Sequence, residues 1–343
     1  MSIAGRLGLR HPLIQAPMAG VSGVRLAAAV CLKGGLGSLP CAFLDSEQTR
    51  AQVRELRAQT EAPFNLNFFC HTPPAADEPA QQRWREALAP LYAEWDIGDP
   101  SSPAGPARRS FGEEQAALVT ELKPAVVSFH FGLPESRWLE SVKASGALVI
   151  SSATTVDEAR WLQDKGVDAV IVQGIEAGGH RGMFLRDTLD DQPPTLELLA
   201  QAAAALTVPL IAAGGIGDRE SVRLALDAGA AAVQVGTAFM LCPECDTSDL
   251  HRQALREAPA RGTVITNLYS GRPARSIRTA LTEQLAPLNP MAPPFPTAGQ
   301  ALAPLRAAAE AAGHYDFTPV WSGTRPEHCS ELPVANVIDA LFS

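Results

Sequence analysis

The sequence VQVGTAF at residues 233–239 and the sequence AAGGIGD at residues 212–218 decide the predicted fold. Each segment is a short apolar run, typical of a buried parallel strand, that ends at glycine. Glycines at such a point allow backbone N–H groups to come close to a bound phosphate. A phosphate site after the last two strands is common in (β/α)8 barrels, so the two segments together favour that fold.

A third segment, QGIEAGGHRG at residues 173–182, places His180 on a glycine-rich turn after another apolar run. Catalytic groups of a barrel come from the C-terminal ends of its strands and from the loops that follow them. The turn is therefore expected at the same end as the phosphate segments. Together the three segments predict an imidazole over the reactive part of a phosphate-bearing cofactor.

Eight apolar runs alternate with segments of helical periodicity, and several are apolar almost throughout, as strands covered on both sides are. Thr155 and Glu158 have the spacing of a capping box, and Gly166 is expected to end the helix that they begin. The count of eight favours a closed barrel over an open doubly wound sheet. The predicted strands are residues 13–18, 35–39, 64–69, 125–131, 148–153, 169–173, 209–213 and 232–237.

Two stretches interrupt this alternation of predicted strands and helices. Residues 71–110 follow the third strand, are rich in proline and contain a predicted helix at 82–95, which indicates a long functional loop. The second stretch begins after residue 241. We expect residues 1–242 to form the barrel, residues 243–297 to form a cap or lid over its mouth, and residues 298–343 to be a helical segment that packs back on the barrel.

Composition limits the function further. The chain has 343 residues, 46% of them hydrophobic, and a formal net charge of −9, which suits one large barrel with an elaboration and disfavours nucleic acid or an anionic membrane as partner. No apolar run approaches the ~20 residues of a membrane span, and the N-terminus lacks the apolar region of a signal peptide. We therefore expect a cytoplasmic protein.

The six cysteines show no disulfide pattern, which suits a reducing compartment. Cys242 and Cys245 have C-x-x-C spacing without a second ligand pair, so two unpaired thiols are favoured over a zinc site or a redox pair.

Exclusion narrows the chemistry at the strand ends. No lysine falls there, so Schiff-base chemistry lacks its amine. The carboxylates are mainly Glu176 and Asp218, too few for a metal site, and no metal is expected. Histidine, amides and a phosphate site remain, and this set suits an organic cofactor that does the difficult chemistry.

The cofactor predicted is FMN, because no G-x-G-x-x-G stands in a βαβ context and the phosphate signals follow the last two strands. Asn67 and Gln173 are candidates for the polar edge of the flavin ring, and Pro17 and Met18 for an apolar wall beside it. A sugar phosphate without flavin is the alternative on these features. The predicted cofactor-binding residues are Ala16, Pro17, Met18, Asn67, Gln173, Gly178, Gly179, Gly214, Gly215, Gln234, Gly236 and Thr237.

Two histidines are the candidates for chemistry. His180 is predicted to be catalytic, either as an imidazolium that holds an anion or as a neutral base that takes a proton from carbon. His130 is divided between a substrate contact and a core histidine with satisfied hydrogen bonds. Arg181 reads as a surface or helix-supporting cation.

The chain resembles the class I nitronate monooxygenases, a family formerly called 2-nitropropane dioxygenases. The resemblance runs through nearly the whole chain, with one departure, where WSGT at 321–324 replaces an expected WAGQ. The motifs that carry it are QAPMAGVS at 15–22, FNLN at 64–67, SFHFG at 128–132, EAGGHRG at 176–182, QVGT at 234–237, Asn267-Leu268 and SGRPAR at 270–275.

The resemblance implies FMN as cofactor, molecular oxygen as oxidant and alkyl nitronates of the propionate 3-nitronate type as substrates. It also implies a flavin semiquinone on the way to a carbonyl product and nitrite, a role in detoxification, and a homodimer. Two alternatives stay open: an FMN-dependent reductase that passes hydride from NAD(P)H to a quinone or enoyl thioester, and a non-catalytic FMN- or phosphate-binding protein.

Overall fold

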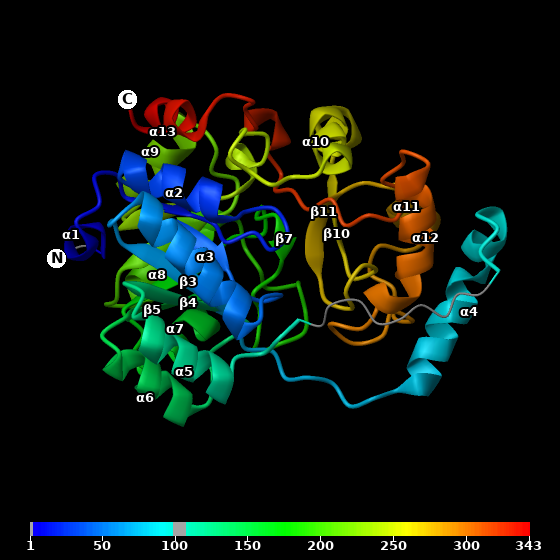
Figure 1. Cartoon of the computed structure of the whole chain (residues 1–343), viewed down its shortest axis with the longest axis horizontal. Helices are drawn as coiled ribbons and strands as arrows, with labels where there is room; N and C mark the ends of the chain where they lie inside the picture. Colours follow the sequence, from blue (N-terminus) through cyan, green and yellow to red (C-terminus); the bar gives the residue numbers. More distant parts are fainter. Residues whose placement is uncertain (1–2, 99–107) are drawn as a thin grey trace.

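The computed structural model describes residues 3–98 and 108–343, and it contains a closed barrel of eight parallel strands. Each strand pairs with its neighbours, and a bridge between Ile14 and Leu36 joins the first strand to the second. The predicted (β/α)8 barrel is therefore confirmed (Figure 1). Met1, Ser2 and residues 99–107 of the long segment after the third strand lie outside the described residues. The barrel strands are β1 (Leu13–Gln15), β2 (Gly37–Pro40), β3 (Phe64–Phe69), β4 (Val126–His130), β5 (Leu148–Ala153), β6 (Ala169–Gln173), β8 (Leu210–Ala213) and β9 (Ala232–Val235).

Helices surround this barrel. Ile3, from a short helix α1 (Ile3–Leu7), joins the apolar cluster inside the barrel, which includes Ile14, Ile150, Ile171 and Ile211. In the described residues, no helix is long and apolar enough to cross a membrane. The outer helices are α2 (Val24–Lys33), α3 (Ser46–Gln59), α5 (Glu113–Leu122), α6 (Ser136–Ala144), α7 (Val156–Asp164), α8 (Thr195–Ala205), α9 (Arg219–Asp227) and α13 (Val334–Phe342).

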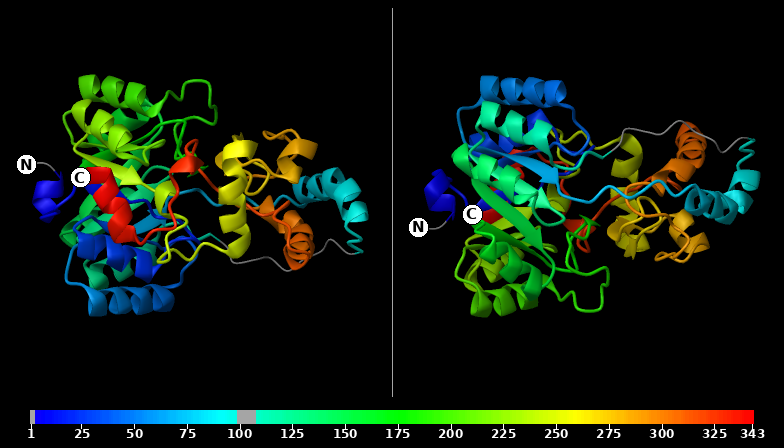
Figure 2. Two further views of the ribbon diagram at one scale, coloured as in Figure 1. Left: turned by 90° about the horizontal axis from the view of Figure 1, so that it is seen from above. Right: turned by 90° about the horizontal axis from the view of Figure 1, so that it is seen from below.

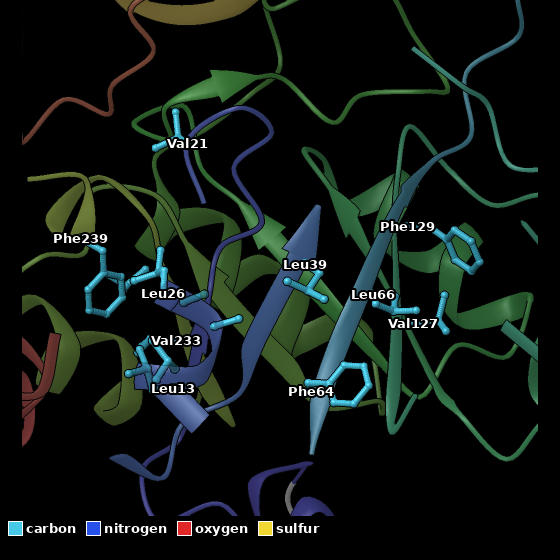
Figure 3. Packing of buried hydrophobic residues seen from close by; sticks show 14 of the residues in the cluster. Leu13, Val21, Leu26, Leu39, Phe64, Leu66, Val127, Phe129, Val233 and Phe239 are labelled. Atoms are coloured by element: carbon cyan, nitrogen blue, oxygen red, sulfur yellow. The ribbon is translucent and has the colours of Figure 1, made fainter. Parts of the chain in front are cut away.

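A larger cluster fills the layer between strands and helices. Figure 3 shows Leu39, Leu66 and Val127 side by side on neighbouring strands, with Phe129 further along β4. These side chains alternate with those that face the barrel interior, because successive residues of a strand point to opposite sides. The two clusters explain why several strands are apolar almost throughout.

Helix α7 differs from its prediction in one respect. Thr155 accepts a hydrogen bond from the Glu158 N–H, as expected of a cap. The Glu158 carboxylate does not return to Thr155. It is buried and accepts from the Thr154 N–H and hydroxyl and from the N–H groups of Phe184 and Leu185. The residue thus fixes the loop that follows the His180 turn instead of closing a capping box.

A second lobe stands beside the barrel (Figures 1 and 2). It contains a three-stranded antiparallel sheet in which β11 (Ala274–Ile277) lies between β10 (Thr263–Thr266) and β7 (Gly179–His180). Its helices are α4 (Glu78–Glu94), α10 (Asp249–Arg261), α11 (Ala280–Gln284) and α12 (Gly299–Ala311). Because β7 belongs to the turn after β6, this sheet ties the His180 turn to the second lobe.

The C-terminal helices pack in two different places. Helix α4, from the long loop after β3, packs against α12 around Trp84, Leu88 and Leu305. The Trp84 indole donates to the Ala298 carbonyl at 3.0 Å. Helix α12 therefore belongs to the second lobe, whereas α13 contacts α2 and α9 on the barrel. Within residues 298–343, the apolar face of α12 is thus covered by α4, whereas α13 lies on the barrel. The segment between these helices also contacts the strand ends, where the Cys329 thiol donates to the Thr237 carbonyl.

Candidate active site

A pocket with a volume of about 430 Å³ lies at the C-terminal ends of the barrel strands, between the barrel and the second lobe. Every residue that the sequence predicted for the site lines it. These residues are Ala16, Pro17, Met18, Asn67, His130, Gln173, Gly178, Gly179, His180, Gly214, Gly215, Gln234, Gly236 and Thr237.

One end of the pocket is built from backbone. Gly214 and Gly215 have φ values of +118° and +67°, which side chains rarely adopt, so glycine is required there. A Cβ added at Gly236 would lie 3.2 Å from the Ala16 Cβ. In the described chain, the N–H groups of Gly215, Ile216, Gly236 and Thr237 have no hydrogen-bond acceptor. A cluster of unpaired backbone donors on a pocket wall suits a phosphate.

Gln234 supplies a second unpaired group beside this cluster. Its Oε1 is buried and has no hydrogen-bond partner among the described residues. An unpaired buried carbonyl oxygen is costly, so a donor from a bound molecule would stabilise it. The segment after β1 offers fewer free N–H groups to a ligand. The Ala16 N–H donates to the Val235 carbonyl at 2.8 Å, and the Met18 N–H donates to the Ser22 hydroxyl at 2.9 Å.

The two predicted amide side chains differ in what they leave free. The Gln173 Oε1 accepts from the Gly182 N–H at 2.8 Å, and its Nε2 donates to the His180 carbonyl at 3.0 Å. Gln173 therefore holds the His180 turn as well as lining the pocket. The Asn67 Nδ2 donates to the Ser128 hydroxyl at 2.9 Å, and its Oδ1 accepts no bond from a described residue.

His180 lies on β7 with its ring in an aromatic enclosure. Its Nε2 is 2.9 Å from the Ser270 hydroxyl of the second lobe, and the rings of Phe295 and Trp321 are 5.4 and 5.2 Å away. Burial lowers the pKa of His180 well below its usual value, and the charge of Arg108 lowers it further. The imidazole is consequently neutral at pH 7, which favours the base over the imidazolium.

His130 has both ring nitrogens bound to protein. The Nε2 is 3.2 Å from the His180 carbonyl, which can only accept, so this nitrogen carries the hydrogen. Burial lowers the pKa of His130 to about 3, so the ring is neutral and its Nδ1 accepts from the Ser152 hydroxyl at 2.6 Å. The residue lines the pocket, but these bonds leave it no nitrogen for a substrate. It supports the backbone of His180.

Several residues of the site were missed from the sequence. Arg181 is fully buried, and its guanidinium donates to Gln192 Oε1 and to the carbonyls of Gly174 and Gln173, so the surface interpretation is wrong. No local pattern distinguishes such an arginine from an exposed one. Four aromatic and cationic residues that line the pocket were also missed, because they come from four separate segments. They are Phe43, Phe69, Arg108 and Trp321.

The segment that departs from the expected motif still contacts the site. The Gly323 N–H donates to the Thr237 hydroxyl at 3.0 Å, and the Thr324 N–H donates to the Glu176 carbonyl at 3.0 Å. A Cβ on Gly178 would come within 2.5 Å of the Gly323 nitrogen. These contacts are made by backbone, so they tolerate the changed side chains.

The cysteines form no metal site. Burial raises the pKa values of Cys242 and Cys329 to about 12, so these thiols are protonated at neutral pH. In the part of the chain that the structure describes, no group of three or more His, Cys, Asp or Glu residues has the arrangement to hold a metal ion.

Fold and pocket together are typical of α/β-barrel enzymes that use a phosphate-bearing cofactor, because unpaired backbone N–H groups and a neutral histidine line the same pocket. Comparison with known proteins gives the family. Residues 3–343 match the family model described as nitronate monooxygenase. The chain belongs to this family of oxidoreductases, so the resemblance and the prediction of an enzyme are confirmed.

Individual relatives support the same family assignment. The chain is 42% identical over 338 residues to a nitronate monooxygenase from Pseudomonas aeruginosa, covering 98% of this chain and 96% of that protein. It is equally 42% identical to one from Paraburkholderia phytofirmans, with 98% and 92% covered. Nitroalkane oxidase from Streptomyces ansochromogenes is similar in structure, with a TM-score of 0.88, 35% identity and 98% and 96% covered. FabK from Thermotoga maritima has a TM-score of 0.73 at 26% identity, with 99% and 94% covered.

Proposed function

We propose that the protein is an FMN-dependent enzyme that oxidises alkyl nitronates with molecular oxygen, giving a carbonyl product and nitrite. The observation that carries the proposal is that one pocket contains both the unpaired N–H groups after β8 and β9 and a neutral histidine after β6. We call the first group the phosphate end and the surroundings of His180 the reaction end. Membership of the nitronate monooxygenase family and the likeness to a nitroalkane oxidase support the same chemistry.

The residues present fit FMN. The N–H groups of Gly215, Ile216, Gly236 and Thr237 would hold its phosphate. The unpaired Gln234 Oε1 and the free Asn67 Oδ1 would accept hydrogen bonds from polar groups of the flavin. When bound, FMN supplies the electron acceptor that no side chain of the pocket provides.

The chain's own contribution centres on His180. Its Nε2 faces Ser270, and its Nδ1 has no hydrogen-bond partner among the described residues, so Nδ1 is the nitrogen available to a substrate. When the Ser270 hydroxyl donates to the Arg272 carbonyl, at 3.3 Å, the histidine Nε2 carries the hydrogen and Nδ1 is a free proton acceptor. When Ser270 donates to Nε2, Nδ1 carries the hydrogen and donates to a nitronate oxygen. One neutral imidazole thus has a tautomer for each role left open by the sequence.

The aromatic rings around His180 limit the access of water to the reacting atoms. The rings of Phe69, Phe131, Phe295 and Trp321 all lie within 6.5 Å of the imidazole. An apolar environment strengthens the hydrogen bond from histidine to an anionic oxygen. It also keeps a nitronate from being protonated back to the unreactive nitro compound.

The test uses purified protein. We expect a yellow holoprotein that releases FMN on denaturation and whose flavin is reduced by a nitronate in anaerobic rapid mixing. Reduction by NAD(P)H instead would favour the reductase alternative, and no reduction by either would favour a binding protein. A colourless protein that does not take up FMN would refute the cofactor. The homodimer and the cytoplasmic location stay predictions, the first checked by light scattering.

A further inference from the structure

Arg108 lies on the pocket wall, and no carboxylate of residues 3–98 or 108–343 forms an ion pair with it. Its guanidinium makes no hydrogen bond with any described residue either. Burial lowers its pKa to about 10, so the guanidinium remains charged at neutral pH. The next residue, Arg109, differs in both respects. It is exposed, and its guanidinium forms an ion pair with the Glu114 carboxylate at 3.1 Å.

Two aromatic rings position this guanidinium. The carbon at its centre lies 5.0 Å from the centroid of Phe43, in the segment after β2, and 5.3 Å from that of Phe295, in the second lobe. A guanidinium stacks on rings through its faces and donates hydrogen bonds in its own plane. The aromatic contacts therefore hold Arg108 in place while its N–H groups remain available.

The charge of Arg108 also acts on the histidines of the reaction end. Its charge contributes, after burial, to lowering the pKa values of both His180 and His71. A partly desolvated charge that has no anionic partner among the described residues is costly, and an anion that enters the pocket would offset the cost. Arginine is suited to carboxylates, which it binds through two parallel hydrogen bonds.

We propose that Arg108 determines specificity by binding a carboxylate that the substrate carries apart from its nitronate group. The inference rests on the proposed function. A strong ion pair to the nitronate itself would stabilise the electron-rich anion before reaction and so oppose its oxidation. A pair to a remote carboxylate stabilises the bound substrate without that cost. Nitronates with a carboxylate are accordingly preferred over nitronates with an uncharged chain.

The experiment compares Arg108→Met with Arg109→Met in the holoenzyme, using propionate 3-nitronate and propyl 1-nitronate. For Arg108→Met we expect KM for propionate 3-nitronate to rise roughly 10–100-fold, the size of a lost charged hydrogen bond, with kcat nearly unchanged. Both constants for propyl 1-nitronate should stay within about twofold. Arg109→Met should match the wild type with both substrates.

Two further measurements separate binding from folding. Calorimetric titration with succinate, an unreactive dicarboxylate, should show weaker binding to Arg108→Met than to the wild type. Arg108→Lys keeps the charge and should recover part of the lost affinity. If Arg108→Met does not fold, the same measurements are made on Arg108→Lys.

Each other outcome has a definite meaning. Equal losses with both nitronates, or no loss with either, would overturn the role of Arg108. A wild-type enzyme that oxidises both nitronates with equal KM would refute the preference but leave the proposed function intact. A wild-type holoenzyme that oxidises neither nitronate would refute the proposed function itself.

Discussion

The two ends of the pocket are built by different means. The phosphate end consists of glycines and backbone N–H groups that directly follow β8 and β9. The reaction end consists of side chains from many segments, among them His180 after β6, Arg108 after α4 and Trp321 far along the chain. Phe295, from the second lobe, packs against the His180 ring. A backbone site is fixed by the barrel itself, whereas a side-chain site depends on how the second lobe packs.

This difference predicts which substitutions remove the cofactor and which change the chemistry. Substitutions at the phosphate end should remove flavin without altering the reaction end. Substitutions at the reaction end should leave flavin bound and change rates or affinities.

The largest effect is expected at the phosphate end. In Gly236→Val the new Cβ would touch the Ala16 Cβ and the Met18 sulfur, and its methyl groups would fill the space that the phosphate needs. In Gly215→Val the backbone would also be strained at φ +67°. Both variants should fold but lose FMN, measured as flavin stoichiometry beside circular dichroism.

The matched control for these variants is Gly98→Val. An added Cβ at Gly98 meets nothing within 4 Å, and the residue is exposed. This variant should keep its flavin. Full flavin occupancy in both Gly215→Val and Gly236→Val would move the phosphate to another part of the pocket.

The second prediction concerns His180. In His180→Asn the FMN should stay bound while kcat/KM falls, by about 10²–10⁴-fold if a positioned acid–base group is lost. Loss of an orienting hydrogen bond alone would cost roughly 1.5–3 kcal/mol. Oxygen uptake at matched flavin content measures the change.

The choice of substrate then separates the two tautomers of His180. A neutral nitroalkane must lose a proton from carbon before oxidation, whereas a preformed nitronate needs no base. A defect confined to the nitroalkane would identify the base, and comparable defects with both would identify the orienting donor. Unchanged kcat/KM with both substrates would remove His180 from the reaction.

The same contrast explains what the sequence could and could not disclose. Strand periodicity predicted the barrel, and the glycines after β8 and β9 predicted the phosphate end, because both signals are local. The partners of α4 were hidden, since Trp84 and Ala298 are 214 residues apart and no local pattern pairs them. Arg108 and Phe295 were missed for the same reason. The hydrogen bonds of His130 and Gln173 depend on atomic distances that only the folded chain fixes.

The third prediction is a pH dependence of stability that arises at the reaction end. Burial lowers the pKa of His130 to about 3, and those of His71 and His251 to about 4. The unfolded chain takes up protons at these residues near pH 6.5, but the folded chain does not until far lower pH. The unfolded state therefore binds more protons in this range, and stability is lost as pH falls below about 6.5.

The expected slope can be given for each histidine, and one of the three histidines offers a control. Each histidine should contribute roughly 1.4 kcal/mol per pH unit between about pH 6 and 5, above the range where most carboxylates titrate. The His251 ring donates to the Trp321 carbonyl and bonds to no other described residue, so His251→Asn should reduce the slope by one histidine. The measurement is urea unfolding at several pH values. A free energy of unfolding that rises on acidification would contradict the prediction.

The smallest effect is expected from the second lobe, where Trp84→Phe keeps an aromatic ring but removes the hydrogen bond to the Ala298 carbonyl. Loss of one buried hydrogen bond should lower the free energy of unfolding by about 1 kcal/mol. Ala298 follows Phe295 by three residues, so we also expect KM to rise a few-fold, with flavin content unchanged. Trp95→Phe is the control, because Trp95 packs on Phe317 without a hydrogen bond from its indole to a described residue. A loss of flavin in Trp84→Phe would show that the second lobe supports the phosphate end too, and the division of the pocket into two independent ends would fail.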